Sequence, residues 1–155
     1  MEGDSASSTE VYAILSSLAD LPIAQSIAVT GSVNQKGEIQ PIGGVNQKVE
    51  GFFDLCRIQG LTGEQGVMVP HQNVRNLMVR DDIVDAVREG RFHVYAVKTI
   101  DEGIEVLTGV PMGARLADKG YHQGTVAYLV DERLQELASS LRGYYAEMLN
   151  DGPRS

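Results

Sequence analysis

Lys48 is a charged side chain whose position suggests chemistry. On a helical wheel of about 100° per residue, residues 45–58 form an amphipathic helix. Lys48 falls inside the apolar arc, between Val45 and Phe52, whereas Glu50 and Asp54 fall on the opposite side. A lysine in this position either extends its ammonium group to water or is held partly desolvated, which makes it a base near neutral pH. Both interpretations stay open on this evidence alone.

A second reactive group, the hydroxyl of Ser5, lies at the start of a helix expected over residues 5–19. Apolar residues recur there at the i, i+3, i+4, i+7 spacing of an amphipathic helix. Asp4 or Ser5 can simply cap this helix, and Ser7 with Glu10 has the spacing of a capping box. A serine in a first helical turn also lies beside unpaired backbone N–H groups, which can stabilise an oxyanion. Capping and nucleophilic catalysis are therefore compatible.

The two stretches together resemble the proteolytic domain of the Lon protease family, the Ser–Lys peptidases. The resemblance covers about residues 2–109, and the separation of Ser5 and Lys48 along the chain matches the family as well. The matching segments are, in order, Glu2-Gly3-Asp4-Ser5-Ala6, Thr30-Gly31, Pro41-Ile42-Gly43-Gly44 with Lys48, Gly66-Val67-Met68-Val69-Pro70, and residues 99–107.

This resemblance implies a catalytic pair in which Ser5 is the nucleophile and Lys48 is the general base, and later the general acid that protonates the leaving amine. Thr30 matches a hydroxyl that hydrogen-bonds the lysine, and Glu2 matches an acidic position three residues before the serine. The reaction would be acyl transfer to water through a serine ester. A lysine serves as the base only if its pKa falls by about three units from its ordinary value of about 10.4, and desolvation can cause a shift of this size.

Asp4 departs from the proline that the commonest bacterial branch of the family has here, although it agrees with other Lon-like branches. The carboxylates of Glu2 and Asp4 could pair with Lys48 and keep its amine protonated. We therefore expect that an inactive resting arrangement is accessible to this chain.

Strands and helices alternate through the rest of the sequence. This alternation predicts an α/β domain with a parallel or mixed sheet. The resemblance implies a Lon-type proteolytic domain (ribosomal protein S5 domain 2-like), in which a mixed sheet has flanking helices, here truncated at the N-terminus. Expected strands are 26–33, 38–42 (after a hairpin turn at Gly37), 66–69 and 92–97, and expected helices are 45–58, 73–78, 81–89 and 100–107.

We expect residues 1–112 to form the C-terminal part of the Lon-like proteolytic domain, and residues 113–155 to form a loop plus a C-terminal amphipathic helix. Apolar residues in this helix follow one another at steps of four and three, as in a coiled coil. Such a helix either docks on its own domain, which we favour, or packs between subunits. The seam consists of Val130, Leu134, Leu137, Leu141, Tyr144 and Met148.

The composition of the chain limits the classes of partner and the kinds of site that we expect. The net charge of −8 disfavours nucleic acid and anionic membranes, because no basic stripe is present to neutralise phosphates. The sequence has no apolar run of membrane-span length. The single cysteine, Cys56, excludes an internal disulfide and suits the reducing cytoplasm. His71, His93 and His122 lack metal-ligand spacing, so no metal is expected.

The resemblance also implies the setting of the chain. It starts abruptly before Ser5, so we interpret Met1 as an expression start or a replaced residue in a piece that lacks the first half of the proteolytic domain. We expect weak or no activity from this piece alone. The sequence lacks a phosphate-loop motif, so ATP and Mg²⁺ are expected only on a separate ATPase module. Unfolded or damaged proteins are the implied substrates, and a homo-oligomer, a hexameric ring, is the implied assembly.

Two other functions compete with a peptidase. The first is a non-catalytic Lon-like scaffold domain used for oligomer assembly, against which the presence of both Ser5 and Lys48 argues. The second is a small-molecule-binding α/β module in which Gly43 and Gly44 cradle a phosphate at a helix N-terminus. A lone pair of glycines is weak evidence for such a site.

Overall fold

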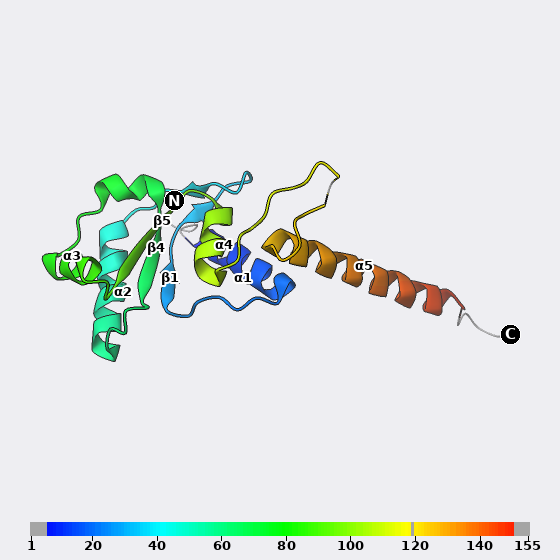
Figure 1. Ribbon diagram of the computed structural model, residues 1–155, viewed down its shortest axis with the longest axis horizontal. Coiled ribbons are helices and arrows are strands. Elements are labelled where there is room, and N and C mark those ends of the chain that lie inside the picture. Colours follow the sequence, from blue (N-terminus) through cyan, green and yellow to red (C-terminus); the bar gives the residue numbers. More distant parts are fainter. Residues whose placement is uncertain (1–5, 119, 151–155) are drawn as a thin grey trace.

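The computed structural model of the 155-residue chain describes residues 6–118 and 120–150. Glu2, Asp4 and Ser5 therefore lie outside the described residues. Helices and strands alternate along the chain (Figure 1). Their order is α1 (Ser7–Ala19), β1 (Ile27–Val29), β2 (Ser32–Val33), β3 (Ile39–Gln40), α2 (Val45–Gln59), β4 (Gly66–Pro70), the 3₁₀ helix η1 (His71–Asn76), α3 (Asp81–Arg88), β5 (His93–Val97), α4 (Ile100–Thr108) and α5 (Val126–Asn150).

A three-stranded parallel sheet in the order β1-β4-β5 forms the centre of the fold. Val67, the second residue of β4, pairs with Ala28 of β1 and with Val94 of β5. The short strands β2 and β3 form a separate antiparallel hairpin, as the turn at Gly37 predicts. The expected α/β class with a parallel sheet and flanking helices is thus confirmed.

The central strand β4 separates two apolar clusters because its successive side chains point to opposite faces. Met68 belongs to the cluster formed with α1, α4 and the start of α5. Val67 and Val69 belong to the cluster formed with α2 and α3, in which the rings of Phe53 and Phe92 meet edge to face at 5.2 Å. All five residues of β4 are buried, as expected for a parallel strand covered on both faces.

The strand expected over residues 26–33 is interrupted at Gly31, which divides it into β1 and β2. Gly31 has a φ of 129°, a value that favours glycine. A Cβ at this position would also lie 2.9 Å from the side chain of Ile39 and 3.3 Å from that of Pro70. This close approach of three segments is non-local, so the alternation of apolar residues could not reveal it.

Helix α5 departs most from expectation. Only its first turns pack on α1, where Val126 is fully buried in the core. The rest of α5 runs away from the body of the molecule (Figure 1), and Leu134, Leu137 and Leu141 are 45–55% exposed. The expectation that this helix docks on its own domain therefore holds only for its first turns. The reason is length: α5 extends for about 37 Å, whereas the 13 residues of α1 extend for about 20 Å.

Candidate functional site

The segment that leads into α2 is fixed by a neighbouring side chain. The amide of Asn73, in η1, donates to the carbonyl of Ile42 and accepts from its N–H, both at 2.9 Å. Asn73 is only 4% exposed. After this clamp, Gly44 takes a left-handed conformation with a φ of 66° and caps α2. The first turn of α2, which carries Lys48, is thus rigidly positioned.

Sequence reasoning missed the role of Asn73, because it treated this residue as the first of a helix. The amide pairs with a backbone segment 31 residues earlier in the chain. No local spacing signals such a contact.

Lys48 lies in the first turn of α2, where its backbone N–H donates to the carbonyl of Gly44 at 3.1 Å. Its side chain is exposed. The buried stripe of the helix is narrower than the apolar arc of the wheel, since Leu55 from the same arc is 51% exposed. Lys48 and Leu55 share the edge of that stripe, which consists of Val45, Val49, Phe53 and Cys56. The interpretation in which Lys48 is desolvated by its own helix face is therefore wrong for the described structure.

Thr30 lies directly after β1 and is 8% exposed. Its N–H donates to the carbonyl of Met68 at 3.1 Å, which continues the pairing between β1 and β4. Its hydroxyl is buried and has no hydrogen-bond partner among residues 6–118 and 120–150. Burial of an unpaired hydroxyl costs roughly 1–3 kcal/mol, so Thr30 offers a buried polar atom that a further group could satisfy.

The start of α1 lies against this same segment. The hydroxyl of Ser8 donates to the carbonyl of Gly31 at 2.6 Å, and the hydroxyl of Ser7 accepts from the N–H of Val33 at 3.1 Å. The N-cap is Ala6, without a side-chain cap, so the expected capping box of Ser7 and Glu10 is wrong. The hydroxyls tie the helix start to the residues after Thr30. The structure thus brings the chain that directly follows Ser5 next to Thr30.

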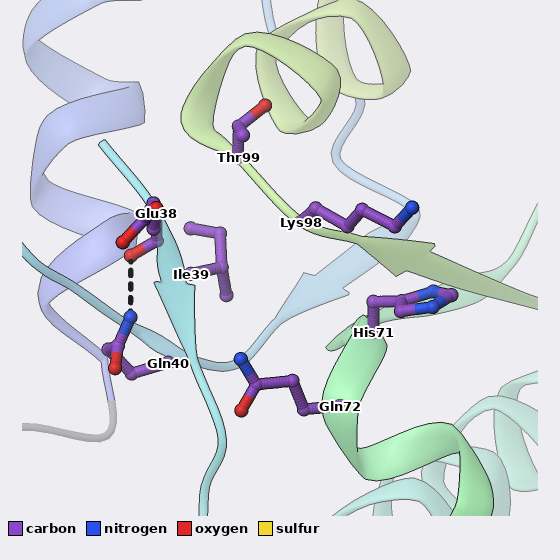
Figure 2. Close-up of a pocket in the computed structure, with 7 residues that line it drawn as sticks. All are labelled: Glu38, Ile39, Gln40, His71, Gln72, Lys98 and Thr99. Atoms are coloured by element: carbon purple, nitrogen blue, oxygen red, sulfur yellow. Dashed lines mark hydrogen bonds between the residues drawn. The ribbon is translucent and has the colours of Figure 1, made fainter. Parts of the chain in front are cut away.

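A separate groove of about 410 Å³ runs between β3, the start of η1 and the turn from β5 to α4 (Figure 2). Gln40 donates to the carbonyl of Glu38 at 3.3 Å on one wall, and His71 and Lys98 line the other wall (Figure 2). The hydroxyl of Thr99 is occupied as the N-cap of α4, where it accepts from the N–H of Glu102. The groove offers polar groups for binding but no paired nucleophile and base.

Outside these segments, the shifted pKa values of acidic side chains and of the cysteine thiol have structural causes. Arg80 donates two hydrogen bonds to Asp54 and two to Asp82, and these bonds hold the pKa values of both carboxyl groups below their usual range. Burial raises the pKa of the Cys56 thiol. Within the described ranges, no three His, Cys, Asp or Glu residues gather in a way that could hold a metal ion. No helix in the same part of the chain has the length and apolar character needed to cross a bilayer.

Comparison with known proteins identifies relatives of the chain. A family model described as the Lon protease (S16) C-terminal proteolytic domain matches residues 1–109. A putative Lon protease homolog of Escherichia coli is 43% identical over 136 residues, 88% of this chain and 22% of that protein. A putative Lon protease homolog of Haemophilus influenzae is 39% identical over 142 residues, 92% of this chain and 24% of that protein. The archaeal Lon protease of Archaeoglobus fulgidus is 37% identical over 105 residues, 68% of this chain and 15% of that protein.

The chain thus spans about a quarter or less of the length of these relatives. Both bacterial matches cover more residues than the family model does, so they continue into the segment that follows Gly109.

Proposed function

Because its residues 1–109 match the family model, the chain belongs to the Lon protease C-terminal proteolytic domain family, and from this premise we propose that it carries a serine peptidase site formed by Ser5 and Lys48. One observation carries the proposal: the matched segment contains both residues, each in its own motif. The substrates proposed are proteins, unfolded or damaged ones in particular, and the bond hydrolysed is the peptide bond.

In the proposed reaction the Ser5 Oγ attacks the scissile carbonyl carbon while the unprotonated amine of Lys48 takes the hydroxyl proton. The resulting ammonium group then gives that proton to the leaving amine, which leaves an ester on Ser5. Water attacks this ester with the same amine as the base, and the acid product leaves with Ser5 regenerated. One lysine thus serves as base, acid and base again.

Thr30 supports this arrangement as a positioning residue. Its buried hydroxyl lacks a partner in the described part of the chain and lies at the segment to which the start of α1 is tied. We propose that this hydroxyl binds the amine of Lys48 in the active arrangement and directs its lone pair toward Ser5. Such a contact would satisfy a polar atom that is otherwise left unpaired.

The exposure of Lys48 bears on the activity of this chain by itself. The side chain of Lys48 is exposed, whereas desolvation is what favours the neutral amine that a general base requires. We therefore propose that the 155-residue chain is weakly active or inactive alone, with the carboxylates of Glu2 and Asp4 available to pair with Lys48. Activity would require a cover over Lys48, from bound substrate or from further protein such as the much longer relatives possess.

The whole-protein properties are also proposals. By similarity to relatives named Lon protease, we propose a ribosomal protein S5 domain 2-like mixed sheet, a cytoplasmic location, a hexameric ring, and an ATPase module with its ATP and Mg²⁺ on another part of the parent protein. We propose no cofactor, nucleic-acid or membrane partner for the chain itself.

Labelling with a serine-directed phosphonate tests the proposal. Under exposures long enough to label a weakly active site, phosphonate attached to Ser5, located by peptide mapping, should be lost in Ser5→Ala and lowered at least tenfold in Lys48→Ala and Lys48→Arg. Lys36→Ala, which removes an exposed lysine from the hairpin turn, is the matched control and should label like the parent chain. Equal labelling of Lys48→Ala and Lys36→Ala would contradict the proposal and favour the non-catalytic scaffold. Robust casein hydrolysis by the chain alone would contradict the inactive resting arrangement.

A further inference from the structure

The part of α5 that leaves the body of the molecule (Figure 1) carries an apolar stripe whose side chains are exposed. Its members are 45–59% exposed, and they are Leu134, Leu137, Leu141, Tyr144 and Met148. The stripe continues from Val130, which packs against the core of the chain itself. A helix in a protein gains most of its stability from packing of its apolar face, and the stripe of α5 is left unpacked in the described structure. Helix α5 also contains Gly143, which costs roughly 1 kcal/mol relative to alanine. A packing partner would compensate for both.

The order of residues in the stripe indicates which partner fits. Successive apolar residues are separated by four, three, four, three and four positions, so the pattern reads the same in both directions along the chain. Two identical helices can therefore pair antiparallel with every apolar position in register around Ser139. The layers would be Leu137 with Leu141 of the second copy, Leu134 with Tyr144, and Val130 with Met148. We propose that α5 pairs in this antiparallel way with α5 of a second copy of this chain.

The charged residues that flank the stripe favour the same orientation. Arg133 directly precedes Leu134 of the stripe, and Glu147 directly precedes Met148. In an antiparallel pair of helices, residues at such flanking positions lie opposite one another across the interface. The sequence then sets Arg133 of each copy opposite Glu147 of the other. Parallel pairing would instead set Arg133 opposite the uncharged Ala138. Arg133 now contacts Glu136 of its own helix at 3.1 Å in an exposed ion pair, which contributes little and can be exchanged.

The size of the contact sets the expected affinity. A two-fold axis at Ser139 places the two globular bodies at opposite ends of the helix pair, so α1, which packs only on the first turns of α5, leaves the stripe accessible. The pair would bury on the order of 1,000 Å² in total, at the lower end for specific interfaces. We therefore expect a reversible dimer with a dissociation constant in the micromolar range.

Sedimentation velocity over a concentration series from about 1 to 300 μM tests the pairing. The parent chain should pass from monomer to dimer, and Leu137→Glu with Leu141→Glu should weaken association at least 100-fold. Ser139→Glu adds a glutamate between these two positions but on the opposite face of α5, and it should leave association unchanged. Both leucines are about half exposed, so their substitution leaves the core intact, and thermal unfolding of the body of the molecule checks this.

A charge exchange tests the orientation. Arg133→Glu and Glu147→Arg should each weaken the dimer by on the order of tenfold, because each creates two like-charge contacts, and the double variant should regain the affinity of the parent chain. A parent chain that stays monomeric at 300 μM would overturn the proposal, as would a dimer insensitive to the two Leu→Glu changes. Single charge variants without effect, or a double variant without rescue, would overturn the antiparallel orientation. None of these results depends on peptidase activity.

Discussion

Gly103→Ala should destabilise the chain, against the rule that alanine is the better residue inside a helix. Gly103 is in α4 and is buried against Tyr12 of α1, which is itself only 1% exposed. A Cβ at Gly103 would overlap the hydroxyl and Cζ of Tyr12, and even Cε1 would be only 2.9 Å away. The glycine thus permits the close approach of α1 and α4, and α1 is the helix that directly follows Ser5.

The opposing effects can be compared in magnitude. Helix propensity alone would make Gly103→Ala stabilising by about 1 kcal/mol. The overlap requires a fully buried ring to move, and overpacking of this kind costs about 1–3 kcal/mol or more. We expect a net loss of about 1–2 kcal/mol, or a fall in melting temperature of about 2–8 °C for a chain of this size. Tyr12→Phe should be neutral or stabilising by about 1 kcal/mol, because the Tyr12 hydroxyl is buried without a partner among the described residues.

Urea unfolding followed by circular dichroism measures both changes, with Gly143→Ala in the exposed part of α5 as the matched control. The control has open space for a Cβ and should gain stability or stay unchanged. Stabilisation by Gly103→Ala equal to that by Gly143→Ala would refute the packing argument. A loss of more than about 2 kcal/mol on Tyr12→Phe would show that the hydroxyl has a partner.

Three further predictions concern single groups. Arg80→Gln should raise the carboxyl titration midpoints of Asp54 and Asp82 in NMR. Because their pKa values are lowered in the folded chain, the stability that Arg80 supplies through these carboxylates is present at neutral pH and is lost as the pH falls from about 4 through the folded-state pKa values. The difference in stability between the parent chain and the variant should therefore shrink in acid, and a difference that stays constant or grows as the pH is lowered would contradict this. Cys56 is 4% exposed and burial raises the pKa of its thiol. The thiol should therefore react with Ellman's reagent at least about 100-fold more slowly in the native chain than in urea. Comparable rates in the two conditions would show that the core around Cys56 is open. Thr30→Val should keep or raise the unfolding free energy and lower phosphonate labelling of Ser5; a less stable variant with unchanged labelling would mean that the hydroxyl is structural.

Local patterns predicted the elements that local chemistry decides. The hairpin around Gly37 follows from a turn sequence between two β-prone stretches, and the hydrogen bond from Gly37 to Asn34 closes it as expected. The amphipathic periodicity of α2 predicted its length and its buried residues Val49 and Phe53. The short apolar run at residues 66–69 predicted the strand β4.

Features that depend on distant contacts could not be predicted in this way. The break at Gly31 exists because Ile39 and Pro70 approach it, and the clamp of Asn73 on Ile42 joins segments far apart in sequence. The wheel gave the direction of Lys48 relative to the apolar arc, but its burial depends on what packs beside that edge. The same limit applies to α5, whose seam was visible in the sequence although the extent of its docking was not.

In the candidate site, too, local motifs could be predicted from the sequence, whereas contacts between distant residues could not. Motif order and spacing were sufficient to indicate the family, which the match over residues 1–109 confirms. The assignment of Ser5 and Lys48 as a catalytic pair stays a prediction, because it is a statement about where two side chains meet. Nothing in the spacing of residues fixes that meeting point.

The distance between the Ser5 Oγ and the Lys48 Nζ is the measurement that tests the central claim most directly. A crystal structure of the phosphonate-labelled protein would give it. The account predicts a separation of about 3 Å, within hydrogen-bond reach, with the Thr30 hydroxyl bound to the same amine. A labelled Ser5 whose oxygen lies more than about 6 Å from a water-surrounded Lys48 amine would contradict the account.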